Sequence, residues 1–282
     1  MQTFLLNDGN SMPLMGLGTY KSTGTEGQRT VAQALQLGYR LIDTAAKYGN
    51  EAEVGRGIRE SGIARQEVFV VTKLWREWLG YAQAKAAFDA SLRQLGLDTL
   101  DLYLIHWPAN ARNYPDWQQV NANTWRALEE LQAEGRVRSI GVSNFWPAHL
   151  EALLQTARVM PAVNQLEFHP GYHQPEVVRY CREKGIALQA WSPLARGRIF
   201  SNEVLQRIAA AHGKTVSQVS LRWIVQQQVT ALPKASTPER MQENLQVFDF
   251  ELTDDEMQQI GQLPEMGFSG ELPDLWPERL NG

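Results

Sequence analysis

The chain has 282 residues, of which 43% are hydrophobic, and a formal net charge of −4 at neutral pH. This length allows one large barrel domain or two smaller domains, and a chain of roughly 300 residues buries about three quarters of its unfolded surface. The slightly acidic balance argues against the basic surface that nucleic acids or anionic membranes require. The single cysteine, Cys181, excludes an internal disulfide framework and fits a reducing compartment.

No signal-peptide pattern follows Met1, and no apolar run approaches the roughly 18 residues that would cross a membrane. These features predict a cytoplasmic protein with neither a nucleic-acid partner nor a membrane partner. We expect the protein to act as a monomer.

Strand-like and helix-like segments alternate along the chain. An Asp8-Gly9 turn predicts an N-terminal hairpin. Apolar stretches that predict strands follow at residues 12–20, 38–45, 68–74, 100–107, 137–144, 161–168, 185–192 and 229–235. Helical periodicity occurs between them, at residues 28–38, 82–96, 123–135 and 175–185. The last of these segments has a proline at its start and a glycine at its end, as helices prefer.

The predicted strands are continuous runs of valine, isoleucine and leucine, which is typical of parallel strands buried on both faces. Eight strand–helix units, about 30 residues apart and with no linker between halves, favour a (β/α)8 TIM barrel. We therefore expect an α/β protein with a single domain over residues 1–282, capped at the bottom by the N-terminal hairpin. The competing architecture is a doubly wound sheet, which is common among nucleotide-binding proteins.

Polar side chains fall where consecutive predicted strands end. Asp43 ends the second strand, Lys73 the third and His106 the fourth, and Tyr48 lies in the loop after Asp43. Each alone could be structural, as a turn cap, a lysine reaching solvent, rim packing or a buried histidine. Together they are harder to explain that way, because a buried lysine needs a counter-ion. Active sites of barrels lie at this end of the strands, so we expect all four to face one bowl.

This set of residues suits proton donation to a carbonyl oxygen. A tyrosine hydroxyl ordinarily has a pKa near 10, and we expect the Lys73 ammonium to lower the pKa of Tyr48 toward the range of a general acid. Asp43 would keep Lys73 charged and in place, and a neutral His106 would orient the carbonyl group. No side chain here supplies a hydride, so the chemistry requires a cofactor.

The common cofactor motifs are incomplete in this sequence. GLGTYK at 16–21 lacks the third glycine of a dinucleotide fingerprint. GVSNF at 141–145 lacks the second glycine of a hydrolase elbow. Tyr81 and Lys85 have the spacing of short-chain dehydrogenases, but they fall where an exposed helix is expected to begin. The five histidines and one cysteine show no zinc spacing, so we expect no metal.

Several separate motifs resemble those of the aldo-keto reductases. In chain order they are GYRLIDTAAKYGNE, VTKLW, LIHWP, GVSNF, NQLEFHP, WSPLARG and PKASTPERMQEN. The resemblance implies a barrel that reduces aldehydes or ketones with NADPH and has no Rossmann fold. It extends to short-loop, bacterial-type members such as 2,5-diketo-D-gluconate reductases and aldehyde reductases. It also implies that the catalytic residues are Asp43, Tyr48, Lys73 and His106.

The resemblance further implies where NADPH or NADP+ binds. The positions that match contacts to the nicotinamide and its ribose are Thr19, Asp43, Ser143, Asn144, Gln165 and Trp191. Those that match contacts to the pyrophosphate, the 2′-phosphate and the adenine are Ser192, Leu194, Lys234, Arg240, Glu243 and Asn244. Two cations and small hydroxyls at a helix N-terminus form a favourable anion site. Ala235 replaces a serine that many members have, and Ser236 or Thr237 could supply the missing hydroxyl.

The substrate pocket would be lined by Tyr20, Trp75, His106 and Trp107. The loop 109–117 and the tail after Leu263 would form its rim, with the tail over the barrel mouth. Two other functions stay open. One is a lyase that forms a Schiff base on Lys73, and the other is a non-catalytic NADPH-binding regulator.

Overall fold

The computed structural model describes residues 2–276 and 278–280. Its centre is an eight-stranded parallel sheet in which the strands follow one another in chain order from β3 to β10. The strands are β3 (Leu17–Gly18), β4 (Leu41–Asp43), β5 (Phe69–Leu74), β6 (Leu100–Ile105), β7 (Val137–Ser143), β8 (Val163–Glu167), β9 (Ala187–Trp191) and β10 (Val229–Ala231). A parallel bridge between Met15 and Ala231 joins the two edges and closes the barrel. The predicted barrel is confirmed, and the doubly wound alternative is wrong.

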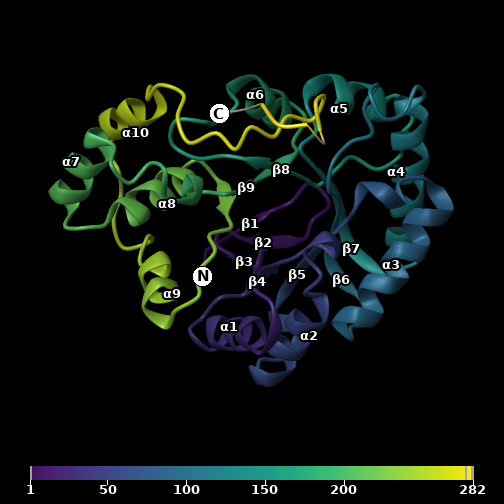
Figure 1. The fold of residues 1–282 in the computed structure, drawn as a ribbon, viewed down its shortest axis with the longest axis horizontal. Helices are drawn as coiled ribbons and strands as arrows, with labels where there is room; N and C mark the ends of the chain where they lie inside the picture. Colours follow the sequence, from purple (N-terminus) through teal and green to yellow (C-terminus); the bar gives the residue numbers. More distant parts are fainter. Residues whose placement is uncertain (1, 277, 281–282) are drawn as a thin grey trace.

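Helices surround the strands on all sides (Figure 1). They are α1 (Gly24–Gln36), α2 (Glu51–Glu60), α3 (Tyr81–Leu95), α4 (Trp117–Ala133), α5 (Pro147–Leu154), α6 (Pro175–Glu183), α7 (Glu203–His212), α8 (Val216–Gln226), α9 (Pro238–Leu245) and α10 (Asp254–Gly261). After α10 the chain crosses the barrel past β8 toward α5, as the yellow segment of Figure 1 shows. None of the helices in the described ranges is long and apolar enough to span a membrane.

Local sequence signals account for several helix boundaries. Thr215 and Gln218 form a capping box at the start of α8, with the Thr215 hydroxyl accepting from the Gln218 backbone N–H. The helix α3 ends at Gly96, whose φ of 65° is left-handed and therefore favours glycine. The helix α6 begins at Pro175, as its sequence predicted.

The N-terminal hairpin forms as predicted and closes the bottom of the barrel. Its strands β1 (Thr3–Leu5) and β2 (Ser11–Pro13) pair in antiparallel fashion around the turn at Gly9. Asn7 donates to the Pro161 carbonyl at 2.9 Å, and Asn10 donates to the Arg138 carbonyl at 3.2 Å. These bonds fix the hairpin to the ends of β7 and β8.

The single strand predicted at 12–20 is wrong, because the segment divides into β2 of the hairpin and the short barrel strand β3. Gly16, between them, lies where the barrel closes. A Cβ atom there would stand 2.3 Å from Leu41 Cδ2 and displace that side chain, and a Cβ atom at Gly18 would stand 2.8 Å from the backbone oxygen of Leu232. The incomplete glycine motif at 16–21 is therefore a feature of barrel closure.

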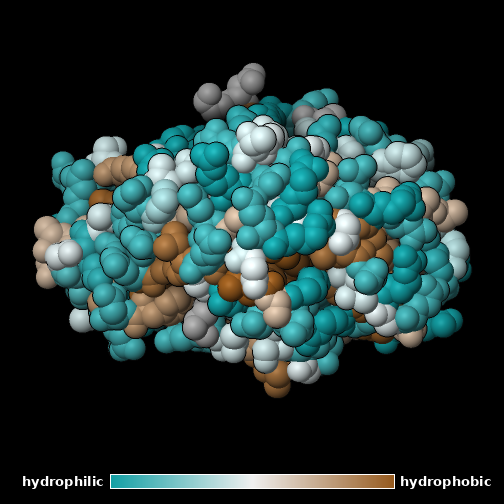
Figure 2. All heavy atoms as spheres, turned by 90° about the horizontal axis from the view of Figure 1, so that it is seen from below, coloured by the Kyte–Doolittle hydropathy of each residue, from teal (hydrophilic) through white to brown (hydrophobic). Residues whose placement is uncertain are grey.

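Hydrophobic residues form two clusters. The larger one lies between the strands and the helices, and the smaller one fills the lower barrel interior with Leu6, Met12, Leu41, Phe69, Val71, Leu102, Leu104, Ala162, Val163 and Leu232. The outer surface on the side of α1 and α2, which lies below in Figure 1, is mostly hydrophilic, with hydrophobic side chains gathered in a band across its middle (Figure 2). The barrel is thus filled at the bottom, which leaves its upper end for polar groups.

Candidate active site

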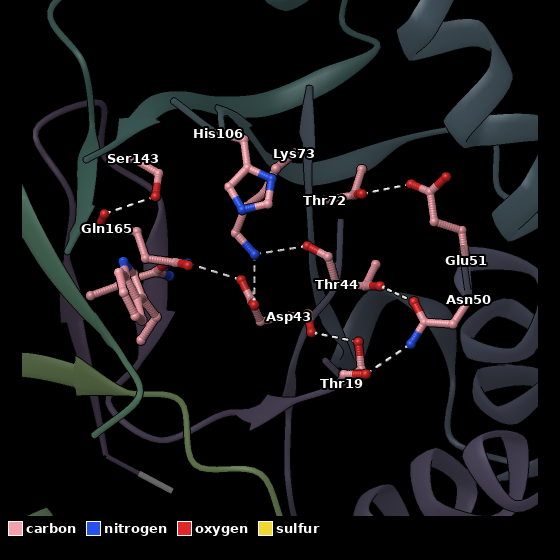
Figure 3. A network of polar contacts seen from close by, with 12 residues as sticks. Thr19, Asp43, Thr44, Asn50, Glu51, Thr72, Lys73, His106, Ser143 and Gln165 are labelled. Carbon is pink, nitrogen blue, oxygen red and sulfur yellow. Dashed lines mark hydrogen bonds and ion pairs between the residues drawn. The ribbon is translucent and has the colours of Figure 1, made fainter. Parts of the chain in front are cut away.

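The polar groups predicted at the strand ends lie together inside the upper barrel (Figure 3). Successive residues of a strand point to opposite faces, so Asp43 projects to the same side as Leu41, and Lys73 to the same side as Val71. Asp43 pairs in register with Val71, and Lys73 with Leu104. The charged residues therefore form the layer directly above the apolar floor.

Lys73 is fully buried and ion-paired with Asp43. Its Nζ donates to Asp43 Oδ1 at 2.7 Å and to the Thr44 carbonyl at 2.8 Å, and the Lys73 side chain has no exposed surface. Burial lowers the pKa of Lys73, and the neighbouring Asp43 carboxylate opposes this shift. The pairing between these two residues that the sequence predicted is confirmed.

Tyr48 lies on the short 3-10 helix η1 (Ala46–Tyr48), above the Lys73–Asp43 pair. The Lys73 Nζ is 5.2 Å from the centre of its ring, and the ring of Tyr20 is 5.0 Å away on another side. The expected lowering of its pKa is wrong. Burial raises the pKa of Tyr48 well above its usual value, and the Asp43 carboxylate adds to the effect because its negative charge disfavours the tyrosinate.

His106 follows β6 and faces Tyr48 and Trp75 with its ring. The ring centroids are 5.8 Å from Tyr48 and 5.2 Å from Trp75. Burial and the charges of Lys73 and Lys47 lower the pKa of His106 well below its usual value, which favours the neutral imidazole. Its Nδ1 is buried and has no hydrogen-bond partner among the described residues.

Asn50 belongs to the same network, although the sequence analysis assigned it no role. Its amide donates to the carbonyls of Thr19 and Ser22, each at 2.8 Å, and its oxygen accepts from the Thr44 hydroxyl at 2.8 Å. Thr44 in turn accepts from Lys73 through its carbonyl group. Asn50 thus ties the loop after β3 to the end of β4, as Figure 3 shows. Its position inside the GYRLIDTAAKYGNE motif was the available signal.

Gln165 links the charged pair to the centre of the barrel. Its Nε2 donates to Asp43 Oδ2 at 2.9 Å and to Gln189 Oε1 at 2.7 Å, so both amide hydrogens are used. Gln189 in turn donates to Met12 Sδ at 3.0 Å. The Gln165 amide is therefore fixed in orientation, with its own oxygen left to accept from a ligand. Gln189 was also missed, because its place in β9 reads as an ordinary buried strand position.

Residues expected at the nicotinamide lie beside this glutamine. Ser143 Oγ donates to the Gln165 carbonyl at 2.8 Å, and Asn144 Nδ2 donates to the His106 carbonyl at 3.0 Å. Trp191 Nε1 donates to Asn144 Oδ1 at 2.8 Å, which holds a partly exposed indole beside the bowl. Asn144 and Ser192 have left-handed backbones, with φ of 62° and 53°. Such conformations cost free energy and are frequent at functional sites.

A second group of predicted residues lies between the end of β10 and α9. Lys234, Ser236 and Arg240 are exposed, and Lys234 Nζ donates to the Lys21 carbonyl at 3.3 Å. Thr237 caps the helix, since its hydroxyl accepts from the Arg240 backbone N–H at 3.4 Å. These cations and the open helix N-terminus fit an anionic group.

Three other positions in this region, Ala235, Glu243 and Asn244, are either buried or already hydrogen-bonded within the protein. Ala235 is buried, at 2% exposure, so its methyl group packs in the core and does not face solvent. The Glu243 carboxylate accepts from the Thr215 hydroxyl at 2.6 Å, and the Asn244 side chain is buried. Leu194 and Ser192 are both partly exposed beside Trp191.

The C-terminal tail covers the mouth of the barrel. Trp276 lies against Trp75 and Trp107, with ring centroids 5.8 Å and 5.7 Å apart. Asn110, in the loop 109–117, donates to the Pro273 carbonyl at 2.8 Å and joins that loop to the tail. The predicted rim of loop and tail is confirmed, and Trp276 is an aromatic wall that the sequence did not single out.

Comparisons with known proteins agree with this geometry. The model of the Aldo/keto reductase family matches residues 14–265. The glyoxal reductase of Bacillus subtilis (strain 168) is 49% identical over 273 residues, which cover 96% of each chain. An aldo/keto reductase from Brucella melitensis, solved by crystallography, has a TM-score of 0.87 and 44% identity, covering 92% of this chain and 98% of that one. A mutant of Gox0644 in complex with NADPH has a TM-score of 0.89 and 40% identity, covering 97% of each chain.

A closed (β/α)8 barrel with a polar site at the strand ends defines a class of barrel enzymes. Within that class, the chain belongs to the aldo/keto reductase family, and it is accordingly an oxidoreductase.

Proposed function

We propose that the protein reduces small aldehydes and ketones, including α-dicarbonyls and keto-sugars, to alcohols with NADPH. The observation that carries this proposal is the buried Lys73–Asp43 pair beneath Tyr48 and a neutral His106. NADPH, when bound, supplies the hydride. The chain supplies the position of the carbonyl group and the proton.

The donors meet at the carbonyl oxygen. Neutral His106 donates a hydrogen bond to that oxygen and directs it toward the Tyr48 hydroxyl. Tyr48 transfers its proton as negative charge develops there. Its raised pKa does not prevent this step, because an alkoxide is a stronger base than a phenolate. Lys73, held by Asp43, stabilises the tyrosinate left behind. A raised pKa also keeps Tyr48 protonated and ready throughout the neutral range.

The residues along β7 to β10 fit the cofactor. Ser143, Asn144 and the free oxygen of Gln165 would hold the carboxamide, and the partly exposed Trp191 would stack on the ring. Lys234 and Arg240 would bind the 2′-phosphate, with Ser236 or Thr237 supplying a hydroxyl. The adenine would contact Glu243 and Asn244, and Glu243 would have to leave Thr215 to do so.

The lyase alternative needs a free lysine amine. Lys73 Nζ instead donates to Asp43 and Thr44 and has no exposed surface, which disfavours attack on a carbonyl group. Borohydride reduction in the presence of an aldehyde would trap a Schiff base on Lys73 if the protein were a lyase. We expect no mass increase on that residue.

The decisive test is NADPH oxidation against a panel of aldehydes, α-dicarbonyls and keto-sugars, followed by identification of the alcohol product. Turnover in the wild type and its loss in Tyr48→Phe would support the proposal. NADPH binding without turnover on any member of the panel would favour the regulator instead.

We also propose that the protein is a cytoplasmic monomer. A single cysteine has no partner for an internal disulfide, which fits a reducing compartment. Burial raises the pKa of Cys181 to about 11 and leaves its thiol unreactive. Sedimentation of the pure protein would test the monomer.

A further inference from the structure

Two cations stand at the mouth of the substrate pocket, next to one indole ring. Lys47 lies on η1 after β4, and Arg76 begins the 3-10 helix η3 (Arg76–Trp78) after β5. The Lys47 Nζ is 4.8 Å and the Arg76 Cζ is 5.9 Å from the centre of the Trp75 ring. Arg76 also lies 4.7 Å from the centre of the Trp276 ring in the tail. Neither residue takes part in the proton transfer or in the cofactor contacts proposed for the site.

Neither cation has a carboxylate partner within 4.0 Å in residues 2–276 and 278–280. Other arginines at the same rim are paired, since Arg112 contacts Glu278 and Arg279 contacts Glu271. Glu271 is the carboxylate of the tail that acts on Tyr48, and its pairing with Arg279 offsets its charge. Lys47 and Arg76 are therefore the rim cations whose charge no carboxylate of the described residues offsets by direct contact.

The positive charges of Lys47 and Arg76 lie close to the reacting centre. The Trp75 ring that both cations border is 5.2 Å from the ring of His106, and His106 is 5.8 Å from Tyr48. The positive charge of Lys47 is one of the causes that lower the pKa of His106, after burial and Lys73. A substrate whose carbonyl oxygen lies between Tyr48 and His106 would extend past Trp75 toward Lys47 and Arg76.

We propose that the preferred substrates are carbonyl compounds that also carry a carboxylate, and that Lys47 and Arg76 bind this carboxylate. The inference rests on the carbonyl reduction proposed above and narrows its substrate class. The carbonyl carbon gains a hydride from NADPH and its oxygen gains the Tyr48 proton, so an oxo acid becomes the corresponding hydroxy acid and the carboxylate is unchanged. Arg76 offers a planar pair of donors to the carboxylate, and Lys47 offers a point charge.

The test compares two closely related aldehydes that differ in charge, 4-formylbenzoate and its methyl ester, with saturating NADPH; their intrinsic reactivities toward hydride are compared by borohydride reduction. We expect kcat/KM for the carboxylate to exceed that for the ester by about 10-fold or more, since tenfold corresponds to 1.4 kcal/mol. That value lies between an exposed ion pair and a charge-assisted hydrogen bond. The ratio should fall as salt is raised, because salt screens exposed charges.

Variants identify the source of the preference. In Lys47→Gln and in Arg76→Gln the carboxylate-to-ester ratio should fall severalfold, and in the double variant it should approach one. The charge-conserving variants Lys47→Arg and Arg76→Lys should retain most of the ratio. Lys184→Gln is a matched control, because Lys184 makes a similar contact with Tyr180, 5.7 Å from its ring, on the helix α6 side of the molecule. This variant should leave the ratio unchanged.

Two results would overturn the inference while leaving carbonyl reduction intact. One is equal or better turnover of the ester in the wild type. The other is a preference for the carboxylate that the double variant keeps in full. Failure to oxidise NADPH with either aldehyde, and with the wider panel, would instead overturn the proposed function itself.

Discussion

Val71 and Lys73 project into the barrel from the same strand, two residues apart, yet they enter opposite environments. Val71 belongs to the apolar cluster that fills the floor above Met12 of the hairpin. Lys73 is equally inaccessible but carries a charge, and its ammonium donates to Asp43 and to the Thr44 carbonyl. One step of the strand pleat, about 6–7 Å, therefore separates hydrocarbon packing from a buried ion pair.

The difference shows that the lower layer of the barrel interior stabilises the fold, whereas the upper layer carries the candidate active site. The floor gains free energy from packing, and it tolerates no voids. The upper layer includes groups that cost free energy, such as the buried charge of Lys73 and the buried His106 Nδ1, which has no partner in the described part of the chain. Substitutions at the two levels should consequently separate stability from activity.

The largest effect is expected for Tyr48→Phe at the upper level. Removing only the hydroxyl should lower kcat for carbonyl reduction by roughly 10²–10⁴-fold, the usual contribution of a general acid. NADPH affinity and thermal stability should stay close to those of the wild type. Steady-state kinetics and fluorescence titration with NADPH test this together. Turnover like that of the wild type would remove Tyr48 from the acid role.

Lys73→Met should affect both properties. Asp43 would keep Gln165 but lose its cation, and breaking a buried ion pair from one side costs about 3–5 kcal/mol. Leu102→Ala is the matched substitution in the floor, where truncating a buried leucine costs about 2–5 kcal/mol. Denaturant unfolding should show losses in both variants, whereas kcat should fall steeply only in Lys73→Met. A stable and active Lys73→Met variant would contradict the buried pair as the centre of the site.

Arg240→Ala should change cofactor choice. A charge-assisted hydrogen bond is worth roughly 1.5–3 kcal/mol, so NADPH should bind about 10- to 100-fold more weakly. NADH has no 2′-phosphate and should be nearly unaffected. Isothermal titration with both cofactors at two salt concentrations measures the difference. Equal losses for both cofactors would mean that Arg240 supports α9 and does not read the phosphate.

The smallest effect concerns pH. The folded pKa of His106 lies well below its ordinary value of 6.5, so kcat should show no titration near pH 6.5. Below 6.5 the unfolded chain takes up a proton that folded His106 refuses, so stability should fall with decreasing pH, by at most about 1.4 kcal/mol per pH unit. His106→Gln removes this term, and comparing unfolding free energies at pH 7.5 and 5.5 isolates it. Identical pH slopes in the two proteins would show that His106 titrates normally.

Strand-end reasoning predicted the ion pair because a lysine at the end of an apolar strand leaves few alternatives. It failed for the pKa of Tyr48. Whether this pKa rises or falls depends on the balance between burial and the Asp43 charge, which raise it, and the positive charge of Lys73. That balance is set by distances and solvent access, which the sequence does not give. The single strand predicted at 12–20 is too long for a similar reason. The close approach of Gly16 to Leu41 is a contact between neighbouring strands that no local pattern records.

The missed residues share a property. Each acts through partners that are distant in the chain. Gln189 contacts Met12 and Gln165. Asn50 contacts Thr19, and Trp276 contacts Trp75. Their own surroundings in the sequence look like an ordinary strand, helix start and tail. The family motifs place residues that touch the cofactor, but residues that only hold those in place become visible once the barrel is closed.

Closure of the barrel depends on a seam between Met15 and Ala231, which lie near opposite ends of the chain. A contact between such distant segments is slow to form, because the closure entropy of the whole intervening chain opposes it. On the ribosome, the N-terminal strand β3 has no second neighbour until β10 has been synthesised. Thr19, which donates to the Asp43 carbonyl, and Lys234, beyond β10, can flank one cofactor only after that moment. With NADPH placed between Thr19 and Lys234 as proposed, the nascent chain lacks a complete cofactor site until β10 has been synthesised.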